Sequence, residues 1–329
     1  MISPSNILHV PCTPDLIEGG ITYALRSLTY AFDRAGSSTY DRLRRVVANV
    51  AVELAFRRYL SQQNISFEVK NALPFTDHER YDVSLGGRRC DLKSFLISNR
   101  EQIAEMQKNS AVLLGAPALV PSDQHAADGH TDHDLYLFAF ISGLIAASQA
   151  DLKKVIEIKQ PHYLVHAMPQ EWRKPLNWNP LGPLALKSES DEELLVEVSG
   201  QDKVRGFLTR TFSLPPKTRV IVEDPFYSIS SLHVRRLPNA RVGIRSMVRN
   251  ETYVIAPLEW ANLWVYAMDI YFTGYTLRGE FSQRARTIPS GARVFQYSVT
   301  RTKNLAMTIS DLRPLEELFD NVRKWEANK

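Results

Sequence analysis

The stretch Arg80–Phe95, RYDVSLGGRRCDLKSF, alternates polar and apolar residues on both sides of a Gly86-Gly87 pair. Before the glycines, Val83 and Leu85 alternate with polar residues, and the alternation resumes after them. A period of two residues is typical of a half-buried strand, and Gly-Gly tolerates the positive φ angles of a two-residue turn. The stretch therefore predicts a β-hairpin.

The turn determines which residues lie opposite each other. With the two glycines in the loop, Val83 pairs with Cys90 and Asp82 pairs with Asp91. Opposed residues share one face of the sheet, so we expect Asp82, Asp91 and Lys93 on one face and apolar side chains on the other. Two facing carboxylates destabilise a sheet unless a cation lies between them. The expected bound cation is Mg²⁺, which proteins hold with one or two carboxylates.

The spacing of Asp82 and Asp91-Leu92-Lys93 resembles the D…(D/E)xK signature of the PD-(D/E)XK nuclease superfamily, the restriction-endonuclease-like fold. Tyr81 precedes the first acid where that signature often has proline, and the second acid is Asp instead of the commoner Glu. The resemblance covers roughly residues 40–160, a typical domain length.

This resemblance implies an α/β fold, with a mixed β-sheet core flanked by helices. It also implies Mg²⁺-dependent hydrolysis of DNA phosphodiester bonds, with Mn²⁺ able to substitute, leaving a 5′-phosphate and a 3′-hydroxyl. Asp82 and Asp91 would bind the metal, and Lys93 would orient or help deprotonate the attacking water. A double-strand cut needs two active sites, which predicts a homodimer or a subunit of a larger nuclease complex.

A helix over residues 40–63 precedes the hairpin, because apolar residues recur there near the helical period. Glu53 lies beside this apolar stripe. In the resembled superfamily such a helix often contributes an acid, so Glu53 is the candidate third metal ligand. The alternative is an ion pair between Glu53 and Arg57 at the i,i+4 spacing.

The remaining elements of the first half follow the order expected for the resembled core. We predict a strand over residues 64–73, a helix over 99–109 and a further strand over 111–120. Gln102 or Gln107 on the predicted helix is a candidate neighbour of the site. The apolar run 135–141 fits a strand buried on both faces.

Two other groups of polar residues are alternative candidates for a functional site. The loop 121–134 holds His125, His130 and His133 among several aspartates, but their spacing fits no metal motif, so a solvated loop is expected. Glu157-Ile158-Lys159 is a rival ExK sequence in a predicted strand over 155–159, with Asp134 as its upstream acid. No tight turn brings these acids together, so the hairpin is the preferred site.

The composition changes near residue 168, where prolines and tryptophans mark an irregular connection. Beyond it, short strands are predicted up to residue 255, then a buried helix over 258–271 and a closing helix over 311–328. We therefore divide the chain into a nuclease-like domain with a helical arm, 1–165, and a β-rich α+β domain for nucleic-acid or partner binding, 166–329.

Charge and composition fit a globular nucleic-acid enzyme without proving one. The 329 residues carry a net charge of +4, a pI of about 8.9 and 44% hydrophobic residues. Cys12 and Cys90 form no metal-ligand spacing, and Cys90 is expected to be buried. No signal peptide or membrane span is predicted, so the expected setting is cytoplasmic.

Clustered arginines provide candidate phosphate contacts. Those assigned to nucleic-acid binding are Arg80, Arg88, Arg89, Arg235, Arg236 and Arg245. The leading hypothesis is a metal-dependent DNA endonuclease of restriction, defence or mobile-element type. A catalytically inactive nucleic-acid-binding or assembly subunit and an RNA-processing nuclease are the alternatives.

Overall fold

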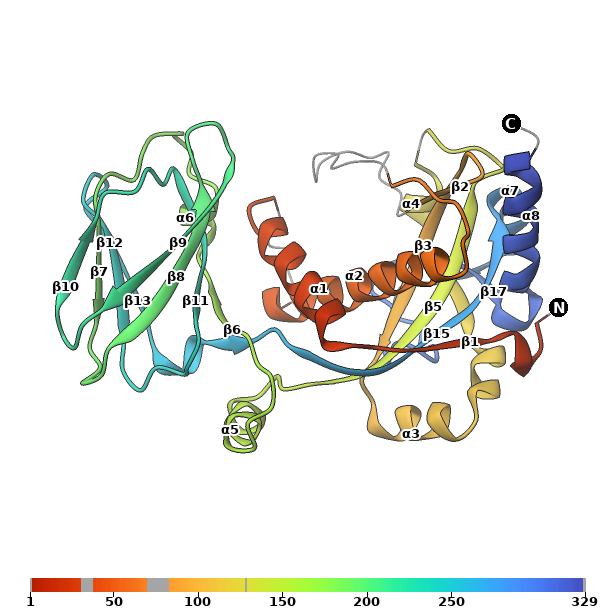
Figure 1. The fold of residues 1–329 in the computed structure, drawn as a ribbon, viewed down its shortest axis with the longest axis horizontal. Coiled ribbons are helices and arrows are strands. Elements are labelled where there is room, and N and C mark those ends of the chain that lie inside the picture. The colour runs from red at the N-terminus through yellow and green to blue at the C-terminus, as the bar shows by residue number, and fades with distance from the viewer. Residues whose placement is uncertain (1, 31–37, 70–82, 128, 328–329) are drawn as a thin grey trace. The chain divides into compact units, whose positions relative to one another are not determined.

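The computed structural model describes residues 2–30, 38–69, 83–127 and 129–327, which form a mixed α/β structure (Figure 1). The chain forms two compact units. Unit 1 comprises Met1–Gly20, Ala48–Leu144 and Tyr266–Lys329, and unit 2 comprises Ile21–Val47 and Ile145–Val265. This division differs from the predicted boundary between residues 165 and 166, because the C-terminal segment belongs to the same unit as the N-terminal segment.

A five-stranded sheet forms the centre of unit 1. Its strands, in spatial order, are β1 (Leu8–Pro11), β15 (Val265–Leu277), β5 (Leu135–Ile145), β3 (Arg88–Ile97) and β2 (Val83–Leu85). β3 and β5 run parallel, whereas β2 and β3 are antiparallel, as are β1 and β15. A smaller sheet contains β16 (Arg286–Ile288), β17 (Asn304–Thr308) and β4 (Pro117–Pro121). The β5 sequence LYLFAFI is fully covered, as its continuous apolar run predicts.

Helices and short helical turns surround these sheets. They are η1 (Pro4–Asn6), α1 (Pro14–Ser27), α2 (Thr39–Gln62), α3 (Arg100–Lys108), η2 (Ser110–Gly115), α4 (Ser122–His125), α7 (Arg278–Arg284), η4 (Ile309–Asp311) and α8 (Leu315–Ala327). α1 and α2 begin in one unit and end in the other. The side chain of Asn99 caps α3 by accepting from the backbone N–H groups of Glu101 and Gln102, so the predicted helix begins where the sequence places a capping residue.

The part of α2 in unit 1 covers one face of the central sheet (Figure 1). The Phe56 ring packs against Phe272 of β15 at 5.4 Å, and the Ser94 hydroxyl of β3 donates to Asn49 Oδ1 at 3.0 Å. Cys90 has the same orientation as Ser94, four residues earlier on β3, and is fully buried, as predicted. The opposite face of β3 therefore points away from α2.

The β2–β3 hairpin has the predicted register. Val83 lies opposite Cys90 and Leu85 opposite Arg88, while Gly86 and Gly87 have φ angles of 57° and 79°. Both angles lie in the left-handed region that a two-residue hairpin turn of this kind requires. The pairing of Asp82 with Asp91 falls outside the described residues and stays a prediction.

Gly86 also provides space for Trp325 of α8. A Cβ atom at this position would lie 2.8 Å from Trp325 Cε3. We expect Gly86→Ala to lower the free energy of unfolding by about 2–4 kcal/mol, because left-handed strain and steric crowding add together. Gly291→Ala is the matched control, since Gly291 has a φ of 88° but nothing within 4 Å. Hydrogen exchange of unit 1 measures both variants; equal losses would mean that Trp325 moves aside freely.

Unit 2 is built from two antiparallel sheets. One contains β10 (Arg219–Val222), β7 (Leu184–Ser188), β12 (Val242–Ser246) and β13 (Glu251–Ile255). The other contains β14 (Ala261–Asn262), β6 (Leu164–Ala167), β11 (Ser228–Val234), β8 (Leu194–Gln201) and β9 (Phe207–Leu214). Leu186, Ile244, Val198 and Leu232 belong to one buried cluster, so the two sheets share a core. The helical pieces are α5 (Gln149–Glu157), α6 (Gln170–Arg173) and η3 (Pro257–Glu259).

Several predicted elements differ in the structure. The described part of the predicted strand 64–73, residues 64–69, contains only an isolated β-bridge at Glu68. Residues 111–115 of the predicted strand 111–120 lie in η2, and only its end forms β4. The closing helix, predicted over 311–328, begins at Leu315.

Two further predicted elements are wrong. Residues 155–159, expected as a strand, mostly continue α5, for which Ser148 is the N-cap residue. Residues 258–271, expected as a buried helix, instead contribute to η3, β14 and β15. A run of aromatic and β-branched residues fits a buried strand as well as a helix, and here pairing with distant strands decides the outcome.

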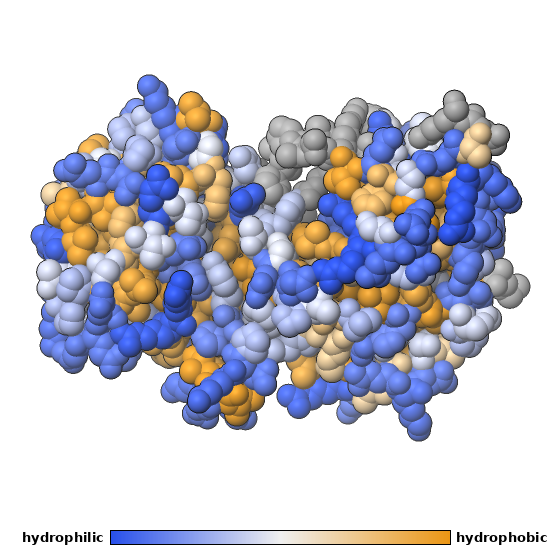
Figure 2. Space-filling model, in the orientation of Figure 1, coloured by the Kyte–Doolittle hydropathy of each residue, from blue (hydrophilic) through white to orange (hydrophobic). Residues whose placement is uncertain are grey.

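Hydrophilic side chains cover most of the face drawn in Figure 2, with smaller apolar areas between them. Near α5, the exposed apolar residues include Ile158 and Leu258, which are 66% and 70% exposed. Exposed apolar residues of this kind are common on protein surfaces and identify no partner. Within the described ranges, no helix has the length and apolar character needed to cross a membrane.

Candidate active site

Asp91 and Lys93 lie side by side on the face of β3 that points away from α2. Lys93 Nζ lies 2.6 Å from Asp91 Oδ2, and the two side chains are 16% and 28% exposed. Their positions follow from strand geometry, because residues two apart project from the same face. The hairpin sequence thus places an accessible carboxylate beside an ammonium group.

A third side chain reaches this pair from α4. Lys93 Nζ donates to Gln124 Oε1 at 2.9 Å. The predicted neighbours, Gln102 and Gln107, lie elsewhere: Gln102 donates to the Phe295 carbonyl, and Gln107 donates to Asp269 Oδ2. The sequence contains no strong signal for Gln124, because its position depends on the path of the 121–134 loop.

His125 holds α4 in place through both ring nitrogens. Its Nδ1 lies 3.0 Å from the Tyr136 hydroxyl, and its Nε2 lies 3.0 Å from Ser282 Oγ. The Ser282 hydroxyl donates its only proton to the Arg278 carbonyl, so Ser282 Oγ accepts from His125 Nε2–H. His125 Nδ1 is then the acceptor from Tyr136 O–H in the neutral ring. The network therefore assigns the tautomer of His125.

Electrostatics keep this network neutral. Burial lowers the pKa of His125, and the nearby charge of Arg278 lowers it further. Burial also raises the pKa of the Tyr136 phenol, so the hydroxyl keeps the proton that it donates. The Asp91 carboxylate contributes to that rise, which places its charge within electrostatic range of Tyr136. The Arg278 guanidinium additionally donates to the His125 carbonyl.

Most described residues of the histidine-containing loop are exposed or half-buried, as expected for a solvated loop, while hydrogen bonds fix its end. Asp134 accepts from the Thr131 N–H at 2.9 Å and from the Thr131 hydroxyl at 3.0 Å. His130 Nδ1 lies 3.4 Å from Asp134 Oδ2. These contacts close the loop immediately before β5 begins. Its role in the structure is thus to carry Gln124 and His125 to the Asp91–Lys93 pair.

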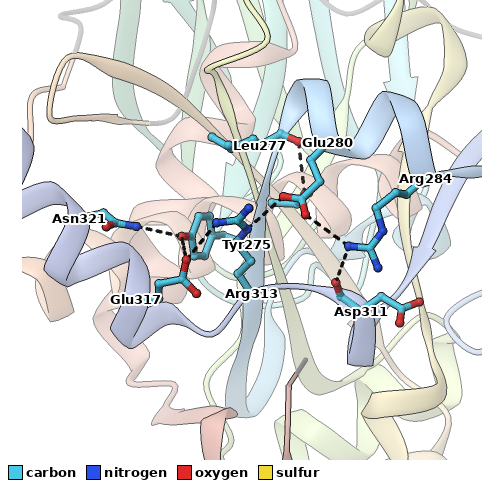
Figure 3. A network of polar contacts seen from close by, with 9 residues as sticks. Tyr275, Leu277, Glu280, Arg284, Asp311, Arg313, Glu317 and Asn321 are labelled. Carbon is cyan, nitrogen blue, oxygen red and sulfur yellow. Dashed lines mark hydrogen bonds and ion pairs between the residues drawn. The ribbon is translucent and has the colours of Figure 1, made fainter.

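An ion-pair network fixes α7, the helix that supplies Ser282 (Figure 3). Arg313 donates to Glu280 at 3.0 Å and to Glu317 at 3.0 Å, and Arg284 lies 3.3 Å from Glu280. The Tyr275 hydroxyl also donates to Glu317 at 3.3 Å. These contacts join α7 to β15 and α8, so elements near the C-terminus support a site built on β3.

Glu53 lies on α2, which covers the other face of β3. Its carboxylate forms an ion pair with Arg57 at 2.7 Å, as in the alternative interpretation, and its side chain is 14% exposed. The contacts described for Asp91 and Lys93 are with each other and with Gln124. The role of Glu53 as a metal ligand stays a prediction, and Asp82 lies outside the described residues.

The Mg²⁺ dependence of hydrolysis distinguishes a metal-binding role of Glu53 from its role as the ion-pair partner of Arg57. From its ion pair and the face that α2 covers, we expect Glu53→Gln to leave unchanged the Mg²⁺ concentration that gives half-maximal hydrolysis. Arg57→Gln removes the same ion pair and is the matched control; each variant should cost about 0.3–0.5 kcal/mol. A several-fold rise in the Mg²⁺ requirement for Glu53→Gln alone would assign Glu53 to the metal.

Several predicted nucleic-acid-binding arginines contact their own unit. Arg88 stacks over the Trp325 ring at 3.9 Å, and Arg89 donates to the Gly129 carbonyl. In unit 2, Arg236 pairs with Glu192, and Arg245 donates to Asn250. These arginines therefore stabilise local structure, whereas their predicted contacts with DNA stay predictions. Arg80 is outside the described residues, and Arg235 stays a prediction.

The rival ExK sequence does not form the expected strand. Glu157 is the last residue of α5, and Lys159 follows in a left-handed conformation with a φ of 55°. The alternation that would place both side chains on one strand face is therefore absent here. Asp134 instead uses its carboxylate to close the loop before β5.

The donor chemistry of the site fits a hard cation. The Asp91 carboxylate is accessible, while the Cys90 thiol is buried and points to the other face of β3. Mg²⁺ prefers oxygen ligands, and one or two carboxylates with waters and phosphate oxygens are enough to hold it. Asp91 and the predicted ligand Asp82 would form such a pair. No cluster of three His, Cys, Asp or Glu side chains suited to a metal ion occurs among the described residues.

Comparisons with known proteins do not identify a family. No protein-family model matches the chain, no curated protein matches it, and no solved structure matches it. The function therefore has to be inferred from the residues of the site itself.

Proposed function

We propose that this chain is a metal-dependent nuclease that hydrolyses phosphodiester bonds of DNA. The observation that carries the proposal is the accessible Asp91–Lys93 pair on one face of β3, in contact with Gln124. A carboxylate and an ammonium group two residues apart on a strand correspond to the (D/E)xK part of the pattern of the resembled superfamily.

The order of elements supports the same proposal. α2 precedes β2 and β3, α3 follows, and the later strand β5 runs parallel to β3. Glu68 also exchanges backbone hydrogen bonds with Ser84 of β2, at 3.0 and 2.8 Å, on the side away from β3. The order of α2, the hairpin and α3 therefore supports the proposal, whereas the strand predicted over 111–120 lies, as β4, in the smaller sheet.

The residues suggest how the reaction proceeds. Asp82 and Asp91 would hold Mg²⁺, which supplies charge neutralisation at the phosphate when bound. Lys93, positioned by Asp91 and Gln124, would orient the attacking water and stabilise the charge that develops on the phosphate oxygens. Two copies of the chain would supply the two sites that a double-strand cut needs.

Cleavage of supercoiled plasmid tests the proposal directly. Purified protein should nick or linearise the plasmid with Mg²⁺ or Mn²⁺ and should leave it intact with EDTA. A labelled RNA duplex of the same sequence tests the substrate class, and a strong preference for it would indicate an RNA-processing enzyme. Failure to cleave either substrate, at DNA concentrations that saturate binding, would favour a non-catalytic nucleic-acid-binding subunit.

A further inference from the structure

The orientation of the Gln124 carboxamide follows from its contact with Lys93. A lysine ammonium group can only donate hydrogen bonds, so the atom that it meets at 2.9 Å is the oxygen, Oε1. The Nε2 group, with two N–H donors, therefore points away from Lys93. Gln124 is exposed, and no described residue accepts a hydrogen bond from this Nε2.

Lys93 also has an N–H donor that the described contacts do not use. Its ammonium group carries three N–H donors, and the described contacts use two acceptors, Asp91 Oδ2 and Gln124 Oε1. Because Asp91 offsets the charge of Lys93, the pair attracts an anion weakly. The two N–H groups of Gln124 have no such neighbouring acceptor, so they gain most from a ligand oxygen.

The backbone that carries Gln124 is held firmly. His125, the next residue, is fixed between Tyr136 and Ser282, and the Arg278 guanidinium donates to its carbonyl. Donors held in place before a ligand arrives lose little entropy when it binds. The anchored backbone and the contact with Lys93 thus place two donors, Lys93 Nζ and Gln124 Nε2, close to each other.

We propose that Lys93 and Gln124 together bind the two non-bridging oxygens of a DNA phosphodiester, with Gln124 as a substrate-binding residue. The inference rests on the proposed function in naming how that site binds its substrate. A phosphodiester carries one negative charge and two equivalent acceptor oxygens, which match one ammonium donor and one carboxamide donor. Gln124 then has two roles, as an acceptor from Lys93 and as a donor to the phosphate.

Two substitutions separate these roles. Gln124→Glu keeps an acceptor for Lys93 and removes both N–H donors, whereas Gln124→Met removes the acceptor and the donors at nearly constant volume. We expect Gln124→Met to weaken binding of a fluorescein-labelled DNA duplex about ten-fold, measured by anisotropy in EDTA at fixed salt. Gln124→Glu should weaken it at least as much.

Asp123→Asn is the matched control for charge, because Asp123 is the exposed neighbour of Gln124 on α4. It changes the local charge by one unit in the opposite direction, and we expect it to tighten binding by less than about three-fold. One outcome would show that only the local electrostatic charge affects DNA binding. In that outcome Asp123→Asn tightens binding by the same factor by which Gln124→Glu weakens it, and Gln124→Met binds like wild type. This result would overturn the proposal. Wild-type binding by Gln124→Glu beside weak binding by Gln124→Met would also overturn it.

Hydrolysis is measured separately, so the two proposals fail in different ways. Wild type that binds DNA but does not hydrolyse it, with both Gln124 variants weakened, would remove the nuclease assignment and keep the phosphate-binding pair. Metal-dependent hydrolysis by wild type, with DNA affinity unchanged in both Gln124 variants, would keep the nuclease assignment and remove the phosphate-binding pair. Absence of DNA binding by wild type would overturn the phosphate-binding pair.

Discussion

Lys93→Met and Asp91→Asn should each lower the rate of metal-dependent DNA hydrolysis by at least about a hundred-fold. Both substitutions keep the approximate volume of the side chain, so the strand and its packing should persist. Lys93→Met removes the donor to the charge that develops on phosphate, and Asp91→Asn weakens the predicted metal ligand. Plasmid cleavage under single-turnover conditions measures both effects.

Metal titration distinguishes the two variants. We expect higher Mg²⁺ or Mn²⁺ to recover part of the activity of Asp91→Asn, because weak metal affinity can be overcome by mass action. The same titration should recover none of the activity of Lys93→Met, whose defect lies in the missing ammonium group. Equal recovery of both variants would mean that Lys93 acts only by supporting Asp91.

An exposed pair of the same residue types provides the control. Lys217 and Asp191 form an ion pair in unit 2, with side chains 63% and 82% exposed. Lys217→Met and Asp191→Asn make the same chemical changes, yet hydrolysis should stay within about two-fold of wild type, since exposed pairs contribute little. Cleavage that survives both substitutions at β3 would place the active site elsewhere in the chain.

Local sequence signals predicted the elements that position the candidate site. The alternation around Gly86-Gly87 predicted the hairpin register, because a one-residue shift would move Val83 and Leu85 to the face that carries Asp91 and Lys93. The helical period of residues 40–63 likewise predicted α2 to within one residue at each end. In both segments the burial pattern and the local backbone preference agree, which makes sequence prediction effective.

Long-range contacts could not be read from the sequence. β1 pairs with β15, so Leu8 lies opposite Phe272, and this pairing joins the two ends of unit 1. No local pattern in either segment specifies its partner, so the sequence alone predicts a boundary at residue 165 and misses that the C-terminal segment belongs to unit 1. The helix predicted over 258–271 is wrong for the same reason. Its apolar run is compatible with the periods of both a helix and a strand, and pairing with distant strands decides between them.

The candidate site was only partly predictable for the same reason. Asp91 and Lys93 follow from one strand, but Gln124 and His125 reach them through a loop whose contacts involve Ser282 and Arg278. The cluster of histidines and aspartates in the loop was a visible signal. It predicted a solvated polar loop, and nothing in its spacing indicates that the loop brings Gln124 and His125 to the site.

Phe281 is the residue whose removal should damage this arrangement most. Its side chain is fully buried, and its ring lies 5.3 Å from Tyr136, 5.8 Å from His125 and 6.2 Å from Phe138. Phe281→Ala should lower the free energy of unfolding of unit 1 by about 3–5 kcal/mol, because it leaves a large cavity and removes aromatic contacts. Phe281→Leu, which fills much of that volume, should cost less than about 2 kcal/mol.

Hydrogen exchange at β5 and β15 is the suitable measurement, since four of the five tryptophans lie in unit 2 and their fluorescence reports mainly on that unit. Phe207→Ala is the control, because Phe207 is 40% exposed and its truncation should cost less than about 1 kcal/mol. Phe281→Leu should also retain more hydrolysis than Phe281→Ala, since the ring supports His125 and hence Gln124. The contrary result would be destabilisation of unit 1 by Phe281→Ala while hydrolysis stays at the wild-type rate. That result would mean that Lys93 and Asp91 act without the support that α7 gives to Gln124 and His125 of α4.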